Sequence, residues 1–392
     1  MISKRSFLAG LAAALPLAAA AAEFTEVVIG YLDRADDPGY AVRHSYETIR
    51  AASVPSPFPG AALAVSDARL IGDAAGLAFK LERATLEDGE DAAKAARALA
   101  SAKHAAAIIL DLPLDETEAV AKALSDLPIA LFNARHRETT LRQSACASHL
   151  FHTIPSTDML ADALAQGLAK RNWKRVLVVA SDDPEDKAVA DTFQASAGKF
   201  GLSIMAVKTF AAGNDPRDRE RNNPRLITGA ADYDVVYLAD HLGDFARTLP
   251  YNTALPRPIV GAAGLVATAW HPYWERQGAP QLNHRFEKAA KHPMSETDWA
   301  TWVAARAIVE AAVRSKARTA ADLIPALLAP TLTLELYKGN PGSFRPWNRQ
   351  MRQPILLATD TAVAGFTPVE GMLHQTNTLD TLGLDEPEFH CP

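Results

Sequence analysis

The chain has 392 residues, with 40 Lys and Arg against 46 Asp and Glu, so its formal net charge at pH 7 is −6. This mildly acidic balance argues against a nucleic-acid partner or an anionic membrane surface, because both select basic proteins. A chain of this length is typical of two domains, each with enough residues for a buried core.

The first 22 residues have the pattern of an export signal. Lys4 and Arg5 precede an apolar, alanine-rich run at residues 7–22, and residues 20–22 form a small-residue cleavage site. The run is shorter than the roughly 20 residues that a bilayer span needs. We therefore expect a signal peptide at residues 1–22, a periplasmic mature protein, and no membrane insertion after cleavage. Because Lys4 replaces the first arginine of a twin-arginine motif, we expect the Sec route rather than Tat.

The first part of the mature chain alternates apolar strands with helical patterns around a proline-rich break. The expected strands are residues 26–32, 77–85, 105–110 and 129–133, the expected helices are residues 42–53, 90–103 and 116–126, and the break is at residues 55–60. Strands that are apolar throughout, separated by amphipathic helices, indicate a parallel sheet covered on both faces. This segment therefore predicts one α/β lobe.

The alternation starts again after residue 150. The expected elements are a helix capped by Ser156-Thr157-Asp158, a strand at residues 175–180, a helix at 185–200 stopped by Gly201, a further strand, and an apolar strand at 235–239. Later come a long helix at residues 295–314 capped by Ser295, strands or irregular returns at 331–366, and a polar tail. The sequence thus predicts a second parallel α/β lobe.

We expect an α/β fold of two Rossmann-like lobes joined by multiple crossings of the chain. The expected division is residues 23–150 plus about 266–330 for lobe one, 151–265 plus about 331–366 for lobe two, and 367–392 for the C-terminal tail.

This order of elements resembles the type I periplasmic binding proteins, the superfamily of the leucine/isoleucine/valine binders of ABC transporters. The segments that carry the resemblance are residues 151–156, 172–176, 233–236 and 299–312. It implies a clamshell that binds a ligand between its lobes, with an ABC permease and ATPase as partners. The Tyr-Gly pair that usually follows the loop at residues 181–183 is missing.

The last third of the chain is similar to one subgroup, the binding proteins associated with PQQ-dependent alcohol oxidation in methylotrophs. The segments concerned are residues 344–350, 352–357, 379–383 and 385–388. The similarity implies a role beside quinoprotein dehydrogenases, some of which need lanthanides. It leaves the ligand open between a lanthanide or its chelate, PQQ, and a small organic solute, and it implies no required cofactor. The alternative function is a periplasmic ligand sensor or dehydrogenase accessory protein that does not transport.

In open α/β sheets a ligand binds at the carboxyl ends of the strands. By this rule the ligand-binding candidates are Tyr31, Asp33, Asp111, Asn133 and Arg135 in lobe one, and Ser181, Asp182, Asp240 and His241 in lobe two. In the amino-acid binders an acidic group near the position of Asp240 meets the ligand ammonium, so Asp240 is the leading candidate. The alternatives are an N-cap of a helix at residues 241–248 for Asp240, and a surface or capping role for His241.

A hard cation such as a lanthanide would need several oxygen ligands. Candidates that could converge across the cleft are Asp33, Asp111, Asp182, Asp183 and Asp240, although aspartates at strand ends also serve as helix caps. The acids of the tail are either a second cluster of possible metal ligands or part of a solvated tail. They are Asp380, Asp385, Glu386 and Glu388.

The aromatic run at residues 270–274 could stack on a planar quinone, with Arg135 or Arg345 meeting its carboxylates, or it could pack between the lobes. The chain contains no HExxH, G-x-S-x-G, Walker A or G-x-G-x-x-G motif, so we expect no enzyme.

The two cysteines, Cys146 and Cys391, are far apart in the sequence. In an oxidising compartment they predict a disulfide that fixes the tail near the junction of the lobes. The alternative is one buried thiol and one thiol at a frayed terminus.

Overall fold

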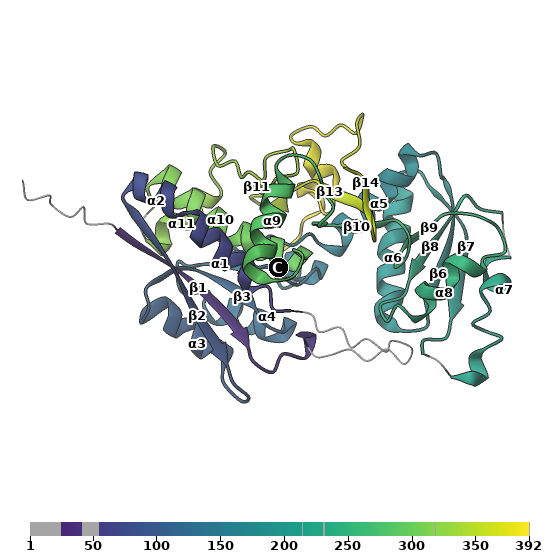
Figure 1. The fold of residues 1–392 in the computed structure, drawn as a ribbon, viewed down its shortest axis with the longest axis horizontal. Coiled ribbons are helices and arrows are strands. Elements are labelled where there is room, and N and C mark those ends of the chain that lie inside the picture. Colours follow the sequence, from purple (N-terminus) through teal and green to yellow (C-terminus); the bar gives the residue numbers. More distant parts are fainter. Residues whose placement is uncertain (1–24, 41–54, 214, 230–231, 318, 392) are drawn as a thin grey trace, which may run out of the picture.

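The computed structural model describes residues 25–40, 55–213, 215–229, 232–317 and 319–391. The predicted signal peptide and the helix expected at residues 42–53 lie outside these residues. Two α/β lobes lie along the long axis of the molecule (Figure 1). No helix within the described ranges is long and apolar enough to cross a membrane.

Lobe one is built on a five-stranded sheet in which every neighbouring pair is parallel, in the order β2-β1-β3-β4-β5. Its strands are β1 (Thr25–Arg34), β2 (Leu77–Leu86), β3 (Ala105–Asp111), β4 (Ala130–Asn133) and β5 (Leu150–His152). All seven residues of β3 are buried because helices cover both faces of the sheet. The helices of lobe one are α1 (Phe58–Asp67), α2 (Arg69–Ala75), α3 (Ala92–Ser101), α4 (Leu114–Ala123), α10 (Glu296–Ser315) and α11 (Ala320–Leu327).

The proline-rich segment is the start of helix α1 rather than a simple break. Pro57 is the N-cap and Pro59 lies in the first turn, where a missing N–H costs nothing. The Thr301 hydroxyl donates to the Pro57 carbonyl (2.8 Å), and a Cβ at Gly60 would clash with the Asp298 carbonyl oxygen. Helices α1 and α2 were therefore missed because their stabilising partner, α10, lies more than 200 residues later in the sequence.

Lobe two is built on a four-stranded parallel sheet in the order β7-β6-β8-β9. Its strands are β6 (Arg175–Ser181), β7 (Ser203–Phe210), β8 (Val235–Ala239) and β9 (Ile259–Gly261). The Ser156 hydroxyl caps the first helix by accepting a bond from the Met159 N–H (3.2 Å), as the sequence predicts. The helices are α5 (Thr157–Lys170), α6 (Pro184–Lys199), α7 (Pro224–Thr228) and α8 (Asp244–Asn252).

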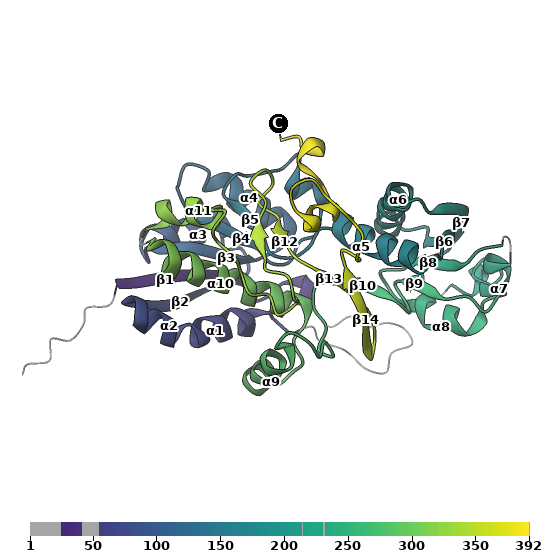
Figure 2. The same ribbon diagram turned by 90° about the horizontal axis from the view of Figure 1, so that it is seen from above.

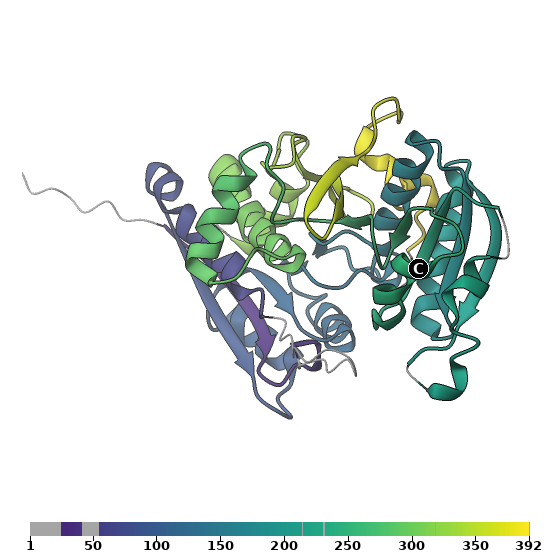
Figure 3. The ribbon, with the colours of Figure 1, turned by 45° about the vertical axis from the view of Figure 1, so that its right-hand side comes forward.

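The chain crosses between the lobes more than once, so the predicted two-lobed α/β fold with multiple crossings is confirmed. After β9, α9 (Ala279–Ala290) and α10 pack on α1 of lobe one. The strands β10 (Val266–Thr268), β13 (Ile355–Thr359) and β14 (Ala362–Thr367) form an antiparallel sheet against α5, between the two lobes (Figure 3).

The lobe boundaries differ from the predicted ones in two places. Strand β5 completes the lobe-one sheet, so lobe one extends past residue 150 to His152. Leu334 and Phe344 lie in the apolar core of lobe one, next to the short pair β11 (Ser343–Phe344) and β12 (Met351–Arg352). Residues 331–352 therefore lie with lobe one rather than lobe two, and only β13 and β14 follow the prediction.

The C-terminal tail is docked, whereas the sequence offered a solvated acidic cluster there. Asp380 is fully buried and pairs with the guanidinium groups of Arg345 (Nε–Oδ1, 2.7 Å) and Arg352 (Nε–Oδ1, 2.8 Å). Arg345, only 1% exposed, also donates to the carbonyls of Leu379 and Leu382. Arg345 is thus committed to the tail and does not meet a ligand carboxylate, contrary to one of our expectations.

The tail contacts both lobes, and it crosses the middle of the molecule in Figure 2. The Gly383 N–H donates to Asp162 of α5 (2.8 Å), and its carbonyl accepts from Lys199 of α6 (3.2 Å). Cys391 forms a disulfide with Cys146, in the loop before β5, with 6.0 Å between the Cα atoms. The predicted disulfide is confirmed, and it connects the end of the chain to lobe one.

Removing the disulfide is expected to destabilise the protein strongly. The bridge closes a loop across 245 positions, and the loss of chain entropy in the unfolded state gives on the order of 4–5 kcal/mol. We expect the Cys146→Ser/Cys391→Ser double variant to unfold at a correspondingly lower urea concentration than the oxidised wild type. Reduced wild-type protein should match the double variant, and equal midpoints for oxidised wild type and variant would contradict the expectation.

Replacing Asp380 with Asn is expected to release the tail. The change leaves two guanidinium groups without their shared carboxylate, and removing one partner of a buried ion pair costs about 3–5 kcal/mol. Urea denaturation measures this loss, and limited proteolysis should cut the variant between residues 370 and 391. The matched control is Asp385→Asn, because Asp385 is partly exposed and its side chain bonds within the tail, to His374 (3.0 Å) and the Glu386 N–H (2.8 Å). Equal stability of the two variants would show that the ion pair does not hold the tail.

Candidate functional site

Two strands of lobe one end in carboxylates that are direct neighbours. Asp33 on β1 and Asp111 on β3 are register partners, 3% and 1% exposed. Because both strands run in the same direction, both acids lie at the carboxyl edge of the sheet, where ligands of α/β proteins bind. The structure thus brings together the two acids that the sequence predicted for lobe one.

Asp111 lies at the centre of a buried hydrogen-bond network. Tyr31 donates to its Oδ2 (2.8 Å), Tyr40 donates to its Oδ1, and the Arg135 Nη1 lies 3.5 Å from Oδ1. Burial raises the pKa of Asp111 to about 6, against the opposing effect of the two tyrosine hydrogen bonds and the Arg135 charge. Burial thus destabilises the ionised form of Asp111 more than its hydrogen bonds and the Arg135 charge stabilise it.

Arg135 is paired inside lobe one and is not free to meet an anionic ligand. Its guanidinium forms a two-bond contact with Asp37 (Nη2–Oδ1, 2.9 Å) and lies over the Tyr40 ring, 5.0 Å from the centroid. Burial opposes ionisation of Asp37, but the bonds from Arg135 and the Gly39 N–H still lower its pKa. Asp37 and Tyr40 were missed because they lie beyond the predicted strand, although polar residues that follow an apolar strand are a usable signal.

Asp33 is paired on one side only. The Nε of Arg83, on β2, donates to its Oδ2 (3.0 Å), while Oδ1 is buried and has no hydrogen-bond partner among the described residues. The Arg83 guanidinium also lies 4.3 Å from the centroid of the Phe58 ring, which meets Tyr31 edge-on at 5.1 Å. Arg83 and Phe58 carried no sequence signal, because only the sheet order places β2 and α1 beside β1.

Asn133 has a structural role at the end of β4. Its amide oxygen accepts the N–H groups of Arg135 (3.1 Å) and His136 (2.8 Å), and its Nδ2 donates to the His136 carbonyl (2.8 Å). Nδ2 also lies 3.0 Å from the buried ring of His152. These bonds fix the turn that carries Arg135, so Asn133 positions a residue of the candidate site.

In lobe two, Asp240 is a capping residue. Its Oδ1 accepts the Gly243 N–H (3.0 Å) and its Oδ2 accepts the Ala246 N–H (2.8 Å), so both oxygens stabilise the start of α8. Burial raises the pKa of Asp240 against these backbone bonds. The capping alternative describes this residue, and a cationic ligand would have to compete with two backbone donors.

Ser181 and His241 meet at Asp186, which the sequence analysis did not identify. The Ser181 hydroxyl donates to Asp186 Oδ2, the His241 N–H donates to Oδ1 (2.8 Å), and His241 Nδ1 lies 3.2 Å from Oδ2. Burial alone would lower the pKa of His241, but the Asp186 carboxylate raises it. Asp182 accepts the Ala212 N–H (2.9 Å) and pairs with Arg221 (2.9 Å), so it too is occupied.

One group of described residues could hold a metal ion. Asp183, Glu185 and His241 each offer one ligand atom, all within 4.8 Å of one another. However, Asp183 caps α6 by accepting the Glu185 N–H (2.8 Å), and acids at the positive end of a helix are stabilising without a metal. Of the five predicted aspartates, only Asp183 belongs to this group, and Asp33, Asp111, Asp182 and Asp240 do not.

The two tryptophans of the aromatic run at residues 270–274 pack inside the protein, whereas Tyr273 is exposed. Trp270 stacks on Trp299 with 5.8 Å between ring centroids, and Trp274 donates to the Tyr337 carbonyl (2.8 Å). Both indoles are at most 4% exposed, so neither presents a face to a planar ligand. The packing alternative is correct for these residues.

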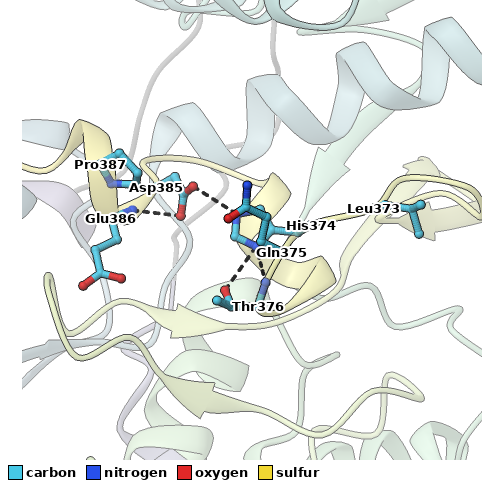
Figure 4. Close-up of a pocket in the computed structure, with 7 residues that line it drawn as sticks. All are labelled: Leu373, His374, Gln375, Thr376, Asp385, Glu386 and Pro387. Carbon is cyan, nitrogen blue, oxygen red and sulfur yellow. Dashed lines mark hydrogen bonds and ion pairs between the residues drawn. The ribbon is translucent and has the colours of Figure 1, made fainter.

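A hollow of about 590 Å³ lies at the tail and not at the strand ends (Figure 4). It contains the ion pair of His374 and Asp385 (3.0 Å) and the exposed side chain of Leu373. Asp385 and Glu386 of the second predicted acidic cluster line it, but none of the candidates at the strand ends does. The network around Asp111 is more deeply buried than these tail acids. We therefore place the candidate site at the lobe-one sheet edge.

Three comparisons with known proteins bear on this arrangement. A profile described as "Periplasmic binding protein" matches residues 59–239, and a search of curated proteins found no match. A putative branched-chain amino acid ABC transporter protein from Rhodospirillum rubrum has a similar structure, with 15% identity and a TM-score of 0.69 over 86% of this chain and 99% of that chain.

Two further similar structures contain different ligands. An ABC transporter substrate-binding protein from Desulfitobacterium hafniense, in complex with Leu, has 17% identity and a TM-score of 0.64 over 87% of this chain and 99% of that chain. A solute-binding protein from Rhodopseudomonas palustris, in complex with 3,4-dihydroxy benzoic acid, has 13% identity and a TM-score of 0.61 over 88% and 97%. At these identities the likeness shows the fold, that of the type I periplasmic binding proteins, and leaves the ligand to the site residues.

The raised pKa of Asp111 predicts a pH dependence of stability. Its folded-state pKa of about 6 lies above the unfolded value of about 3.9, so the folded state retains the proton between these values. Stability is therefore lost as pH rises through about 4 to 6, by on the order of 2–3 kcal/mol. Asp111→Asn lacks this titration, so the wild type should gain about that amount relative to the variant when the pH falls from 8 to 4. Urea denaturation at both pH values measures it, and a constant difference would contradict the assigned pKa.

Proposed function

We propose that this protein is the periplasmic solute-binding component of an ABC importer, which captures a small ligand between its lobes and delivers it to a permease and ATPase. The two-lobed fold, the profile match at residues 59–239 and the solute-binding relatives support this proposal. The proposed activity is binding and not catalysis.

The observation that carries the proposal is the network of Tyr31, Tyr40, Asp111 and Arg135 at the carboxyl edge of the lobe-one sheet. Burying a carboxylate costs free energy, and Asp111 is buried with a raised pKa. The core of the sheet is otherwise formed by apolar residues of β1 and β3, so the Asp111 carboxylate and the Arg135 guanidinium are not packing groups. Perturbed groups at a ligand-binding edge are typical of functional sites.

The link to PQQ-dependent alcohol oxidation is a finer proposal, and it rests on the resemblance of the last third of the chain. Arg345, Arg352 and Asp380 in the resembling segments are the groups that dock the tail. The resemblance therefore concerns how the tail is held, and the ligands it implies are hypotheses for a screen. They are a lanthanide ion or its chelate, PQQ, and a small organic solute.

A ligand screen by thermal shift tests the proposal on the purified mature protein. A ligand at 100 times its Kd stabilises the folded state by about 2.7 kcal/mol, which gives a clear rise in Tm. We expect at least one small solute to do so and to reduce the radius of gyration in small-angle X-ray scattering. Tyr40→Phe should weaken this binding, because it removes a hydroxyl that contacts Asp111.

The control is Tyr251→Phe, since Tyr251 is 86% exposed on lobe two. A ligand that binds wild type, Tyr40→Phe and Tyr251→Phe equally would place the site elsewhere. Failure of amino acids, aromatic acids, amines, PQQ and lanthanide chelates alike to raise Tm would contradict a solute-binding function.

A further inference from the structure

The described residues at the carboxyl edge of lobe one carry more acids than bases. There are three carboxylates, Asp33, Asp37 and Asp111, and two guanidinium groups, Arg83 and Arg135. Arg83 pairs with Asp33, and Arg135 pairs with Asp37 at close range. Within the described chain, Asp111 has two tyrosine hydroxyls as close donors, and its nearest guanidinium, Arg135 at 3.5 Å, is already bonded to Asp37.

A second observation at the same place is the orphaned oxygen of Asp33. Asp33 is 3% exposed, and its Oδ1 is buried without a hydrogen-bond partner within the described chain. Buried acceptors in native proteins are nearly always satisfied, so an orphaned carboxylate oxygen requires a reason. A ligand that supplies a hydrogen-bond donor would be such a reason.

The two carboxylates are placed to share a single cation. Asp33 and Asp111 are register partners on neighbouring parallel strands, so their side chains leave the sheet on the same face. An ammonium group has three N–H donors and no acceptor. It can donate to Asp33 Oδ1 and to Asp111 at once, which satisfies the orphaned oxygen and balances the excess charge.

The surrounding rings also suit an organic cation. Phe58 and Tyr40 already have guanidinium groups over their faces, at 4.3 Å for Arg83 and 5.0 Å for Arg135. These two rings thus already stabilise positive charge through their π faces at this edge of the sheet. Tyr31 is fully buried, whereas Tyr40 is half-buried. Tyr40 is therefore the more exposed of the two tyrosine donors to Asp111.

At the sheet edge of lobe two, two basic groups are already engaged by acids. At its sheet edge, Arg221 pairs with Asp182 (2.9 Å) and His241 faces Asp186 (3.2 Å). Asp183 and Glu185 add further negative charge there. The acids at both edges thus favour a ligand with positive charge.

We propose that the ligand is an organic cation that carries a primary ammonium or guanidinium group and no carboxylate, and that Asp33 and Asp111 determine this specificity. The inference rests on the proposed solute-binding function and specifies the chemical class of the solute. It differs from binding of a zwitterionic amino acid, which would also need hydrogen-bond donors for its carboxylate.

Isothermal titration of the mature protein with matched probes tests the inference. The cationic probes are 1,4-diaminobutane and agmatine, and the comparison probes are 1,4-butanediol, butyrate, leucine and lanthanum chloride. We expect a cationic probe to bind at least tenfold more tightly than any comparison probe. Asp33→Asn and Asp111→Asn should each weaken that binding at least tenfold, because each removes one charge-assisted hydrogen bond.

The matched control is Asp126→Asn, because Asp126 is 61% exposed, pairs only with Arg97 outside the network, and precedes β4 at the opposite edge of the sheet. It should bind the cationic probe as the wild type does, and circular dichroism should show that all three variants are folded. Equal binding by Asp33→Asn, Asp111→Asn and wild type would overturn the proposed specificity.

The comparison probes distinguish failure of this inference from failure of the proposed function. Tighter binding of butyrate, leucine, butanediol or lanthanum, with domain closure in small-angle scattering, would overturn the organic-cation class and leave the solute-binding function standing. Absence of binding and closure with every probe and with the whole thermal-shift panel would overturn both.

Discussion

The buried carboxylate of Asp380 is the point on which the arrangement of the molecule depends. It is fully buried between Arg345 and Arg352, and a guanidinium as buried as that of Arg345 is tolerated only with such a partner. Arg345 and Arg352 flank the β11–β12 turn, which lies against β4 and β5 through Phe344. The tail is therefore a structural part of the junction between the lobes.

The tail also limits how the two lobes can move. Gly383 bonds to Asp162 and Lys199 of lobe two, while Cys391 is covalently joined to Cys146 of lobe one. Any opening or closing of the lobes must either carry these contacts along or bend the tail between Gly383 and Cys391. The hydrogen bonds to lobe two can break during such a motion, whereas the disulfide cannot. The end of the tail at Cys391 therefore stays attached to lobe one.

The fold was predictable where the signal is local. The apolar strands at β3, β6 and β8 and the serine caps of α5 and α10 follow from residues that are neighbours in the sequence. Helix α1 was not predictable, because its proline-rich start is stabilised by Thr301 of α10. The disulfide was predictable since only two cysteines exist, whereas the Asp380 ion pair was not, because nothing in the spacing assigns partners among many acids and arginines.

The residues of the candidate site were likewise predictable only where the signal is local. The sequence identifies Asp33 and Asp111 because both end apolar strands. It cannot show that both carboxylate oxygens of Asp240 accept backbone N–H groups, whereas Asp33 Oδ1 has no hydrogen-bond partner among the described residues. That difference depends on loop conformation. Because of it, Asp33 and not Asp240 becomes the stronger candidate for binding a ligand. A carboxylate satisfied by its own backbone has little to gain from a ligand, whereas a buried carboxylate without enough donors gains a full charge-assisted bond. Recognition of a charged group therefore belongs to lobe one, and the acids of lobe two contribute through capping and through the overall negative potential of the sheet edge.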